Sequence, residues 1–291
     1  MSGRRYLYRR SPPGFAGLST LPAHSRGAIP TLIDNTNLVV GVLDQGQLGS
    51  CELNSWAQAI RAQEIVQAAT DLAGESGCTF DEALVTIMRS PPELAARLAM
   101  YFAAQAYGGY AGQGDTGTTS QDVMTALSMF GYCRESEVPY VDSENAIDPG
   151  ALLEQVKRLA FDQRFTETAR VDSDMMTADE ADTAIANALA GRHLVAYATD
   201  VDQAFENLTP GKIWPGPTGQ SLGGHCVTIV ARGPANKLSK HTTSTAIVYK
   251  ILNSWSAEWD EGGYLLMSVG ALRDRYDACV VVQTPTFSGT V

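Results

Sequence analysis

The feature that most limits what this chain can fold into is a cysteine at the start of an apolar helical pattern. Residues 44–51 read DQGQLGSC, and the apolar side chains that follow recur at helical spacing: Leu53, Trp56, Ala57, Ile60 and Ile65. The pattern predicts a half-buried helix with the Cys51 thiol in its first turn. Backbone N–H groups at a helix start favour negative charge, so we expect the thiolate form of Cys51 to be stabilised there.

The loop before this cysteine has residues suited to catalysis. Gly46 and Gly49 allow a tight turn and close approach to a substrate. Gln45 lies six residues before the thiol, and its amide could donate a hydrogen bond to a developing oxyanion. Taken by itself, the segment also fits an ordinary loop–helix junction with a structural cysteine.

Two later motifs supply partners for a nucleophilic cysteine. His225 opens a β-branched apolar run (residues 223–230, GGHCVTIV), which is typical of a buried strand. Asn253 ends another strand-like run and is followed by Ser254 and Trp255. A catalytic cysteine needs a base, and the base needs a third group to orient it. A lone histidine or asparagine is usually structural, but Cys51, His225 and Asn253 together supply all three roles in order.

The three motifs resemble those of the papain-like cysteine peptidases. The resemblance extends from about Ile29 to about Ser268, and residues 253–264 (NSWSAEWDEGGY) match the third family signature. It implies that Cys51 is the nucleophile, that His225 is the base and later the acid, and that Asn253 orients the imidazole.

The resemblance also implies roles for residues around the triad. Gln45 would join the Cys51 backbone N–H in the oxyanion hole, and Trp255 would shield the His–Asn hydrogen bond from water. Gly117 and Thr118 would pair with the backbone of an extended substrate. An alternative for residues 115–119 is a helix start capped by Thr118 or Thr119, and both interpretations can hold at once. Gly224 and Trp255 complete the expected substrate-binding residues.

Several residues depart from the family pattern. Leu48 stands where the family has a structural cysteine, so that disulfide cannot form. The chain has five cysteines, and this odd number does not favour a full disulfide framework. Glu52 replaces the tryptophan that usually follows the nucleophile. Its carboxylate would raise the pKa of the thiol, unless it points away and complements the helix N-terminus.

Length and charge fit a globular enzyme. With 291 residues the chain can bury a large core, as one two-lobed domain or as two separate domains. The predicted fold class is α+β: a papain-like helical lobe beginning at Cys51, a lobe with an antiparallel, barrel-like sheet, and a cleft between them. The net charge of −11 argues against nucleic acid or an anionic membrane as partner. No run reaches the roughly 18 apolar residues of a membrane span.

The N-terminal residues form a separate region. We expect residues 1–28 to be a short extension before a peptidase domain of residues 29–291, because residues 29–34 resemble the start of the family's mature enzyme. The extension is rich in Pro, Gly, Ser and Arg, which is poor material for an independent fold. It is either a disordered leader or an intramolecular inhibitor that lies over the cleft, with its arginines attracted to the acidic body. It lacks the apolar core of a secretory signal, which leaves a cytoplasmic location or a signal-independent export route open.

The expected activity is peptide hydrolysis on peptide or protein substrates, through an acyl-enzyme formed on Cys51. We assign no residues to a metal or a cofactor. Two alternatives remain at this stage: an acyl transferase of the transglutaminase type, and a catalytically silent papain-like binding module, for which Glu52 is the only support.

Overall fold

The computed structural model describes residues 5–13, 29–143, 154 and 167–284. In chain order, the elements of these residues are β1 (Ile33–Asp34), η1 (Thr36–Leu38), α1 (Cys51–Ser76), α2 (Phe80–Ile87), α3 (Arg97–Tyr107), α4 (Ser120–Phe130), β2 (Glu167–Arg170), α6 (Ala178–Ala190), β3 (Val195–Asp202), α7 (Gln203–Glu206), β4 (Ile213–Trp214), β5 (Ser221–Pro234), α8 (Ala235–Leu238), β6 (Ile247–Leu252), β7 (Tyr264–Ser268), η4 (Val269–Asp274) and β8 (Arg275–Gln283).

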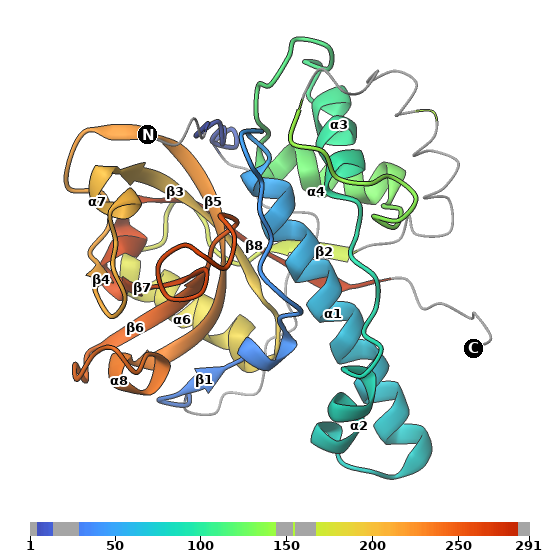
Figure 1. Cartoon of the computed structure of the whole chain (residues 1–291), viewed down its shortest axis with the longest axis vertical. Helices are drawn as coiled ribbons and strands as arrows, with labels where there is room; N and C mark the ends of the chain where they lie inside the picture. The colour runs from blue at the N-terminus through green and yellow to red at the C-terminus, as the bar shows by residue number, and fades with distance from the viewer. Residues whose placement is uncertain (1–4, 14–28, 144–153, 155–166, 285–291) are drawn as a thin grey trace.

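These elements form two lobes, with α1 to α4 in one and most of the sheet in the other (Figure 1). The sheet has the strand order β2-β8-β3-β5-β6-β7-β4, and β1 pairs with β5. Every pairing is antiparallel except that of β4 with β7. The predicted α+β class is therefore confirmed. The sheet stays open, because its end strands β2 and β4 do not pair, so it is less barrel-like than expected.

The helix predicted from Cys51 is present, but it is more deeply buried than the pattern indicated. Every residue from 51 to 60 is buried, because this part of α1 lies between the sheet and the other helices (Figure 1). Its polar side chains have partners there. Ser55 Oγ lies 2.9 Å from Thr228 Oγ1 on β5, and Arg97 donates to Asn54 Oδ1 at 2.7 Å. Such pairing offsets the cost of removing polar groups from water.

Alternation along β5 determines which way the residues of the second motif face. Cys226 belongs to the core cluster around α1, whereas Val227 and Ile229 belong to the second core cluster, on the α6 side of the sheet. Successive residues of a strand point to opposite faces. His225 therefore shares the face of Val227, where its ring meets Trp255.

Local capping explains where α4 begins and ends. The Thr119 side chain accepts a hydrogen bond from the Asp122 N–H at 3.0 Å, which confirms Thr119 as the cap of the predicted helix. The helix ends at Phe130, and the N–H of Gly131 donates to the Leu127 carbonyl. Within the described residues, no helix is both long enough and apolar enough to cross a membrane.

Candidate active site

The loop before α1 lies against the segment that follows β6. The Gln45 N–H donates to the Ser254 carbonyl at 2.9 Å, and Asp44 forms a β-bridge with Trp255. Gly46 has φ of +58°, and a Cβ there would come within 2.2 Å of Asp142 Oδ2. Only glycine fits this turn without displacing its neighbour. The loop thus brings the first and third sequence motifs together.

Cys51 is the first residue of α1 and is fully buried. A backbone hydrogen bond from Cys226, the residue after His225, reaches its thiol. Burial nevertheless raises the pKa of Cys51 to about 12, and the charge of Glu52 adds to the rise. The expectation of a stabilised thiolate is therefore wrong for this arrangement, because desolvation outweighs the favourable helix start.

His225 and Asn253 form the predicted pair. The distance between His225 Nε2 and Asn253 Oδ1 is 2.9 Å, and the Ser254 N–H donates to the same oxygen at 2.8 Å. Because Oδ1 is an acceptor only, Nε2 carries the hydrogen, and Nδ1 is the basic nitrogen of the neutral ring. The Trp255 indole stacks on the imidazole, with centroids 5.1 Å apart and an interplanar angle of 30°. Trp255 is 1% exposed, which suits a shielding role.

The Gln45 side chain is held by two hydrogen bonds. Its Oε1 accepts from Ser254 Oγ at 2.7 Å, and its Nε2 donates to the Leu48 carbonyl at 3.0 Å. The second contact fixes which end of the amide is the donor, because a carbonyl oxygen can only accept. The second uses one of the two N–H groups of the amide, so the other is the donor that an oxyanion would require.

The predicted substrate-binding residues lie beside residues 5–13 of the same chain. The Thr118 carbonyl accepts from the Arg9 N–H at 2.9 Å, and the Gly224 carbonyl accepts from the Tyr8 N–H at 3.1 Å. A Cβ on Gly117 would lie 1.7 Å from the Leu7 carbonyl oxygen. These backbone bonds are of the kind expected for an extended substrate. Figure 1 shows the segment near the start of α1.

Glu52 points into the protein rather than toward solvent. Its Oε1 accepts from Trp56 Nε1 at 2.7 Å and from Ser120 Oγ at 2.8 Å. Burial raises the pKa of Glu52 to about 7. Of the two possibilities considered from the sequence, the first holds, because the charge of Glu52 contributes to the raised pKa of Cys51; the side chain is buried rather than at an exposed helix start.

Sequence reasoning did not identify Asp115 as a residue that links the site. Its carboxylate accepts from the Gly49 N–H at 3.0 Å and from Tyr101 Oη at 2.6 Å, and it forms an ion pair with Arg5 at 3.1 Å. It therefore ties the loop before Cys51 to the N-terminal segment. The only sequence feature that marked Asp115 was its position in a glycine-rich tract. Its partners could not be inferred, because Gly49 and Arg5 are distant in the sequence.

The five cysteines, Cys51, Cys78, Cys133, Cys226 and Cys279, are all free thiols. This agrees with the expectation drawn from Leu48 and from the odd number of cysteines.

Comparison with known proteins connects this geometry to a family. Residues 106–287 match the family described as papain family cysteine protease. The matched stretch contains His225 and Asn253 and begins after Cys51. Fruit bromelain from Ananas comosus is 29% identical over 93 residues, which cover 32% of this chain and 24% of the bromelain sequence. The alignment thus spans about a quarter of that relative.

Solved structures show the same fold. Xylellain, a cysteine protease from Xylella fastidiosa, is 21% identical, with 96% of each chain covered and a TM-score of 0.68. ProCathepsin B S9 from Trypanosoma congolense is 13% identical, with 98% of this chain and 88% of that chain covered and a TM-score of 0.65. The two-lobed fold predicted from the motifs is therefore confirmed.

Proposed function

The chain belongs to the papain family of cysteine proteases, and from this premise we propose that it is an endopeptidase whose catalytic residues are Cys51, His225 and Asn253. The observation that carries the proposal is the hydrogen bond of 2.9 Å between His225 Nε2 and Asn253 Oδ1. This bond fixes the tautomer of the His225 ring. The residue after His225 on β5, Cys226, forms a backbone hydrogen bond to the Cys51 thiol.

The first half of the reaction follows from these roles. The Cys51 proton passes to His225 Nδ1, and the sulfur attacks the carbonyl carbon of the scissile peptide bond. The negative charge on the carbonyl oxygen is stabilised by the Cys51 backbone N–H and the second N–H of the Gln45 amide. When the C–N bond breaks, His225 gives its proton to the leaving amine.

Water completes the cycle. His225 takes a proton from water, the hydroxide attacks the thioester carbonyl carbon, and the C–S bond breaks to release a carboxylic acid. The proton on His225 returns to the Cys51 sulfur, so the enzyme is restored with one water molecule consumed. Asn253 keeps the ring oriented through both halves, and Trp255 keeps solvent from the bond between them.

We also propose that residues 1–28 act as an intramolecular inhibitor of a peptidase domain formed by residues 29–291. Residues 5–13, the described part of the extension, hydrogen-bond to Thr118 and Gly224, where a substrate backbone would bind. One of the similar proteins, proCathepsin B S9, is by its name a proform. A segment that occupies these backbone groups excludes a substrate from them.

The test is hydrolysis of a fluorogenic peptide library by the full chain and by its Cys51→Ala variant. We expect turnover by the parent protein and none above background by the variant, with unchanged circular dichroism. Equal turnover by both proteins would refute the assignment. An added amine that forms a transfer product at the expense of hydrolysis would instead identify an acyl transferase.

A further inference from the structure

Tyr8 of the N-terminal segment has its side chain in a closed pocket. It is 5% exposed, and its ring stacks on that of Tyr276, with centroids 6.0 Å apart and an interplanar angle of 25°. Its hydroxyl donates to Asp277 Oδ2 and lies 3.1 Å from Ser120 Oγ. A buried phenol requires partners for its hydroxyl, and this pocket provides them.

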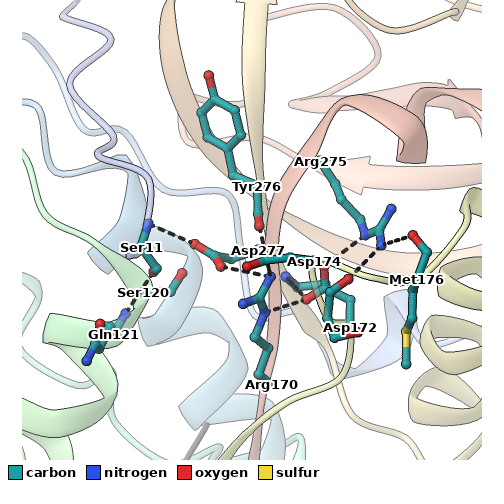
Figure 2. A network of polar contacts seen from close by, with 12 residues as sticks. Ser11, Ser120, Gln121, Arg170, Asp172, Asp174, Met176, Arg275, Tyr276 and Asp277 are labelled. Atoms are coloured by element: carbon teal, nitrogen blue, oxygen red, sulfur yellow. Dashed lines mark hydrogen bonds and ion pairs between the residues drawn. The ribbon is translucent and has the colours of Figure 1, made fainter. Parts of the chain in front are cut away.

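The pocket carboxylate is held in place from the other side. Asp277 Oδ1 lies 3.4 Å from an Arg170 guanidinium nitrogen, and both side chains are 1% exposed (Figure 2). Arg170 is itself fixed, since it donates to Asp172 at 2.9 Å and to Asp174 at 2.7 Å. One oxygen of Asp277 thus faces a permanent cation, and the other faces the pocket.

The donors to the pocket oxygen come from the N-terminal segment. Two of them are the Tyr8 hydroxyl and the Ser11 N–H. The Ser11 N–H lies 3.4 Å from Asp277 Oδ2, as Figure 2 shows. When the segment leaves the groove, both donors leave with it. The vacated pocket then presents an acceptor oxygen to solvent, and an incoming side chain that excludes this water must bring its own donor.

We propose that this pocket, formed around Ser120, Tyr276 and Asp277, is a side-chain specificity site that selects a tyrosine residue of the substrate, and that Asp277 is the residue that recognises its hydroxyl. The proposal rests on the peptidase function proposed above. In this arrangement Tyr8 occupies the position that the tyrosine side chain of a substrate would take. Arg170 acts through Asp277 and is a positioning residue.

Shape and charge favour tyrosine over other donors. The Tyr276 ring offers a flat face for stacking, which a phenol fills and an alkyl ammonium does not. Arg170 already supplies a cation to the same carboxylate, so a lysine or arginine of the substrate would add like charge beside it. Phenylalanine would stack on the ring but would leave Asp277 Oδ2 without its donor.

The test uses the full chain with Tyr8→Ala, which empties the pocket and retains every residue of its wall. Its substrates are matched peptides that differ at one residue on the N-terminal side of the scissile bond and carry tyrosine, phenylalanine, lysine or leucine in turn at each of four positions. We expect kcat/KM for tyrosine to exceed that for phenylalanine about 10- to 100-fold at one position. Any remaining competition from the segment weakens all the peptides alike.

Substitutions of the residues that form the pocket test which of them causes the preference for tyrosine. Adding Asp277→Ala should reduce the preference for tyrosine over phenylalanine to less than about threefold, because the acceptor is gone. Asp277→Asn keeps an acceptor oxygen and should restore part of the preference. Ser120→Ala should reduce it by a smaller amount and provides a second measurement if Asp277→Ala does not fold.

A measurement of peptide binding by an inactive variant tests the specificity pocket independently of the proposed peptidase activity. The double variant Cys51→Ala, Tyr8→Ala should bind the tyrosine peptide about 10- to 100-fold more tightly than the phenylalanine peptide by calorimetry, whether or not the parent cleaves either. Cleavage without a preference for tyrosine, a preference for lysine, or a preference that Asp277→Ala leaves intact would overturn the specificity site. Tyrosine-selective binding without any hydrolysis would support the pocket and refute the peptidase.

Discussion

The phenol ring of Tyr6 packs edge-on against the imidazole of His225, with the ring centroids 5.8 Å apart. The same ring packs against Trp255 at 5.9 Å, and its hydroxyl donates to Glu206. Two residues later, Tyr8 enters its pocket. The segment therefore contacts the proposed base and, over the neighbouring residues, the backbone groups that would bind a substrate.

We expect Tyr8→Ala to raise kcat/KM of the full chain for short peptides by about 10- to 100-fold. The change removes a buried aromatic side chain, which contributes about 1.5–3 kcal/mol to holding the segment in the groove. The measurement is turnover of one fluorogenic dipeptide by the two proteins. Tyr107→Ala, at a tyrosine that is 42% exposed, is the matched control and should leave kcat/KM unchanged. An unaltered rate for Tyr8→Ala would show that the segment does not limit access.

Salt should have a small effect on activity. Attraction of the arginines to the acidic body was the expected reason for docking, but Arg9 and Arg10 lie over the rings of Tyr110 and Tyr276 instead. Arg5 does pair with Asp115, but its side chain is 50% exposed. Exposed pairs contribute about 0–1 kcal/mol. We expect Arg5→Ala, or about 0.5 M salt, to raise kcat/KM less than about fivefold. A rise as large as that from Tyr8→Ala would restore the electrostatic explanation.

Asn253→Ala should reduce kcat by about 10- to 100-fold, less than His225→Ala, which we expect to remove activity. Asn253 accepts from the His225 ring and transfers no proton, so its loss leaves a base that is poorly oriented but present. Steady-state kinetics of the two variants side by side make the comparison. An asparagine variant as inactive as the histidine variant would mean that Asn253 does more than orient the ring.

Gln45→Ala should lower kcat by about 10²- to 10³-fold with KM nearly unchanged, as for removal of other oxyanion donors. Ser254 holds the Gln45 amide through its hydroxyl, at 2.7 Å. Ser254→Ala should therefore lower kcat by a smaller factor, because the amide is present but less fixed. A raised KM at constant kcat for Gln45→Ala would indicate a role in ground-state binding instead.

The sequence was sufficient for the parts of the site that have strong local signals. Cys51 lies at a helix start because a turn-forming loop precedes an apolar helical pattern, and both can be read over about twenty residues. The Asn253 motif directly follows β6 and is marked by Trp255, whereas His225, which the apolar run predicts at a strand start, lies inside β5 after Gly223 and Gly224. Their order along the chain, together with the family resemblance, was enough to expect that they meet.

The pocket could not be predicted, because its contacts join residues far apart in the chain. Tyr8 meets Asp277 across 269 positions, and Glu52 meets Ser120 across 68. Neither contact has a periodic signal. Glu52 was also misleading by type, since glutamate is seldom fully buried unless its oxygens find donors such as Trp56 and Ser120. Trp56 lies one turn further along the same helix, whereas Ser120, at the start of α4, reaches Glu52 only in the folded chain.

The last prediction concerns how the buried Glu52 carboxyl group makes the stability of the fold depend on pH. Burial raises its pKa from 4.5 to about 7. For a carboxyl group with a raised pKa, the fold favours the protonated form. Its contribution to stability is therefore fully present below pH 4.5 and is lost as the pH rises through 7. A rise of this size corresponds to about 3 kcal/mol of unfolding free energy.

We therefore expect Glu52→Gln, which keeps an acceptor for Trp56 and Ser120, to gain stability relative to the parent as the pH increases. Urea unfolding at about pH 4.5 and about pH 8 should show the difference between variant and parent growing by about 3 kcal/mol in favour of the variant. Glu75→Gln, at an exposed position of the same helix, is the control and should show no such trend. The variant should also react faster with iodoacetamide at Cys51, because the Glu52 charge contributes to the raised pKa of that thiol. A pH-independent difference would mean that Glu52 is already protonated at the higher pH or is solvated in the fold.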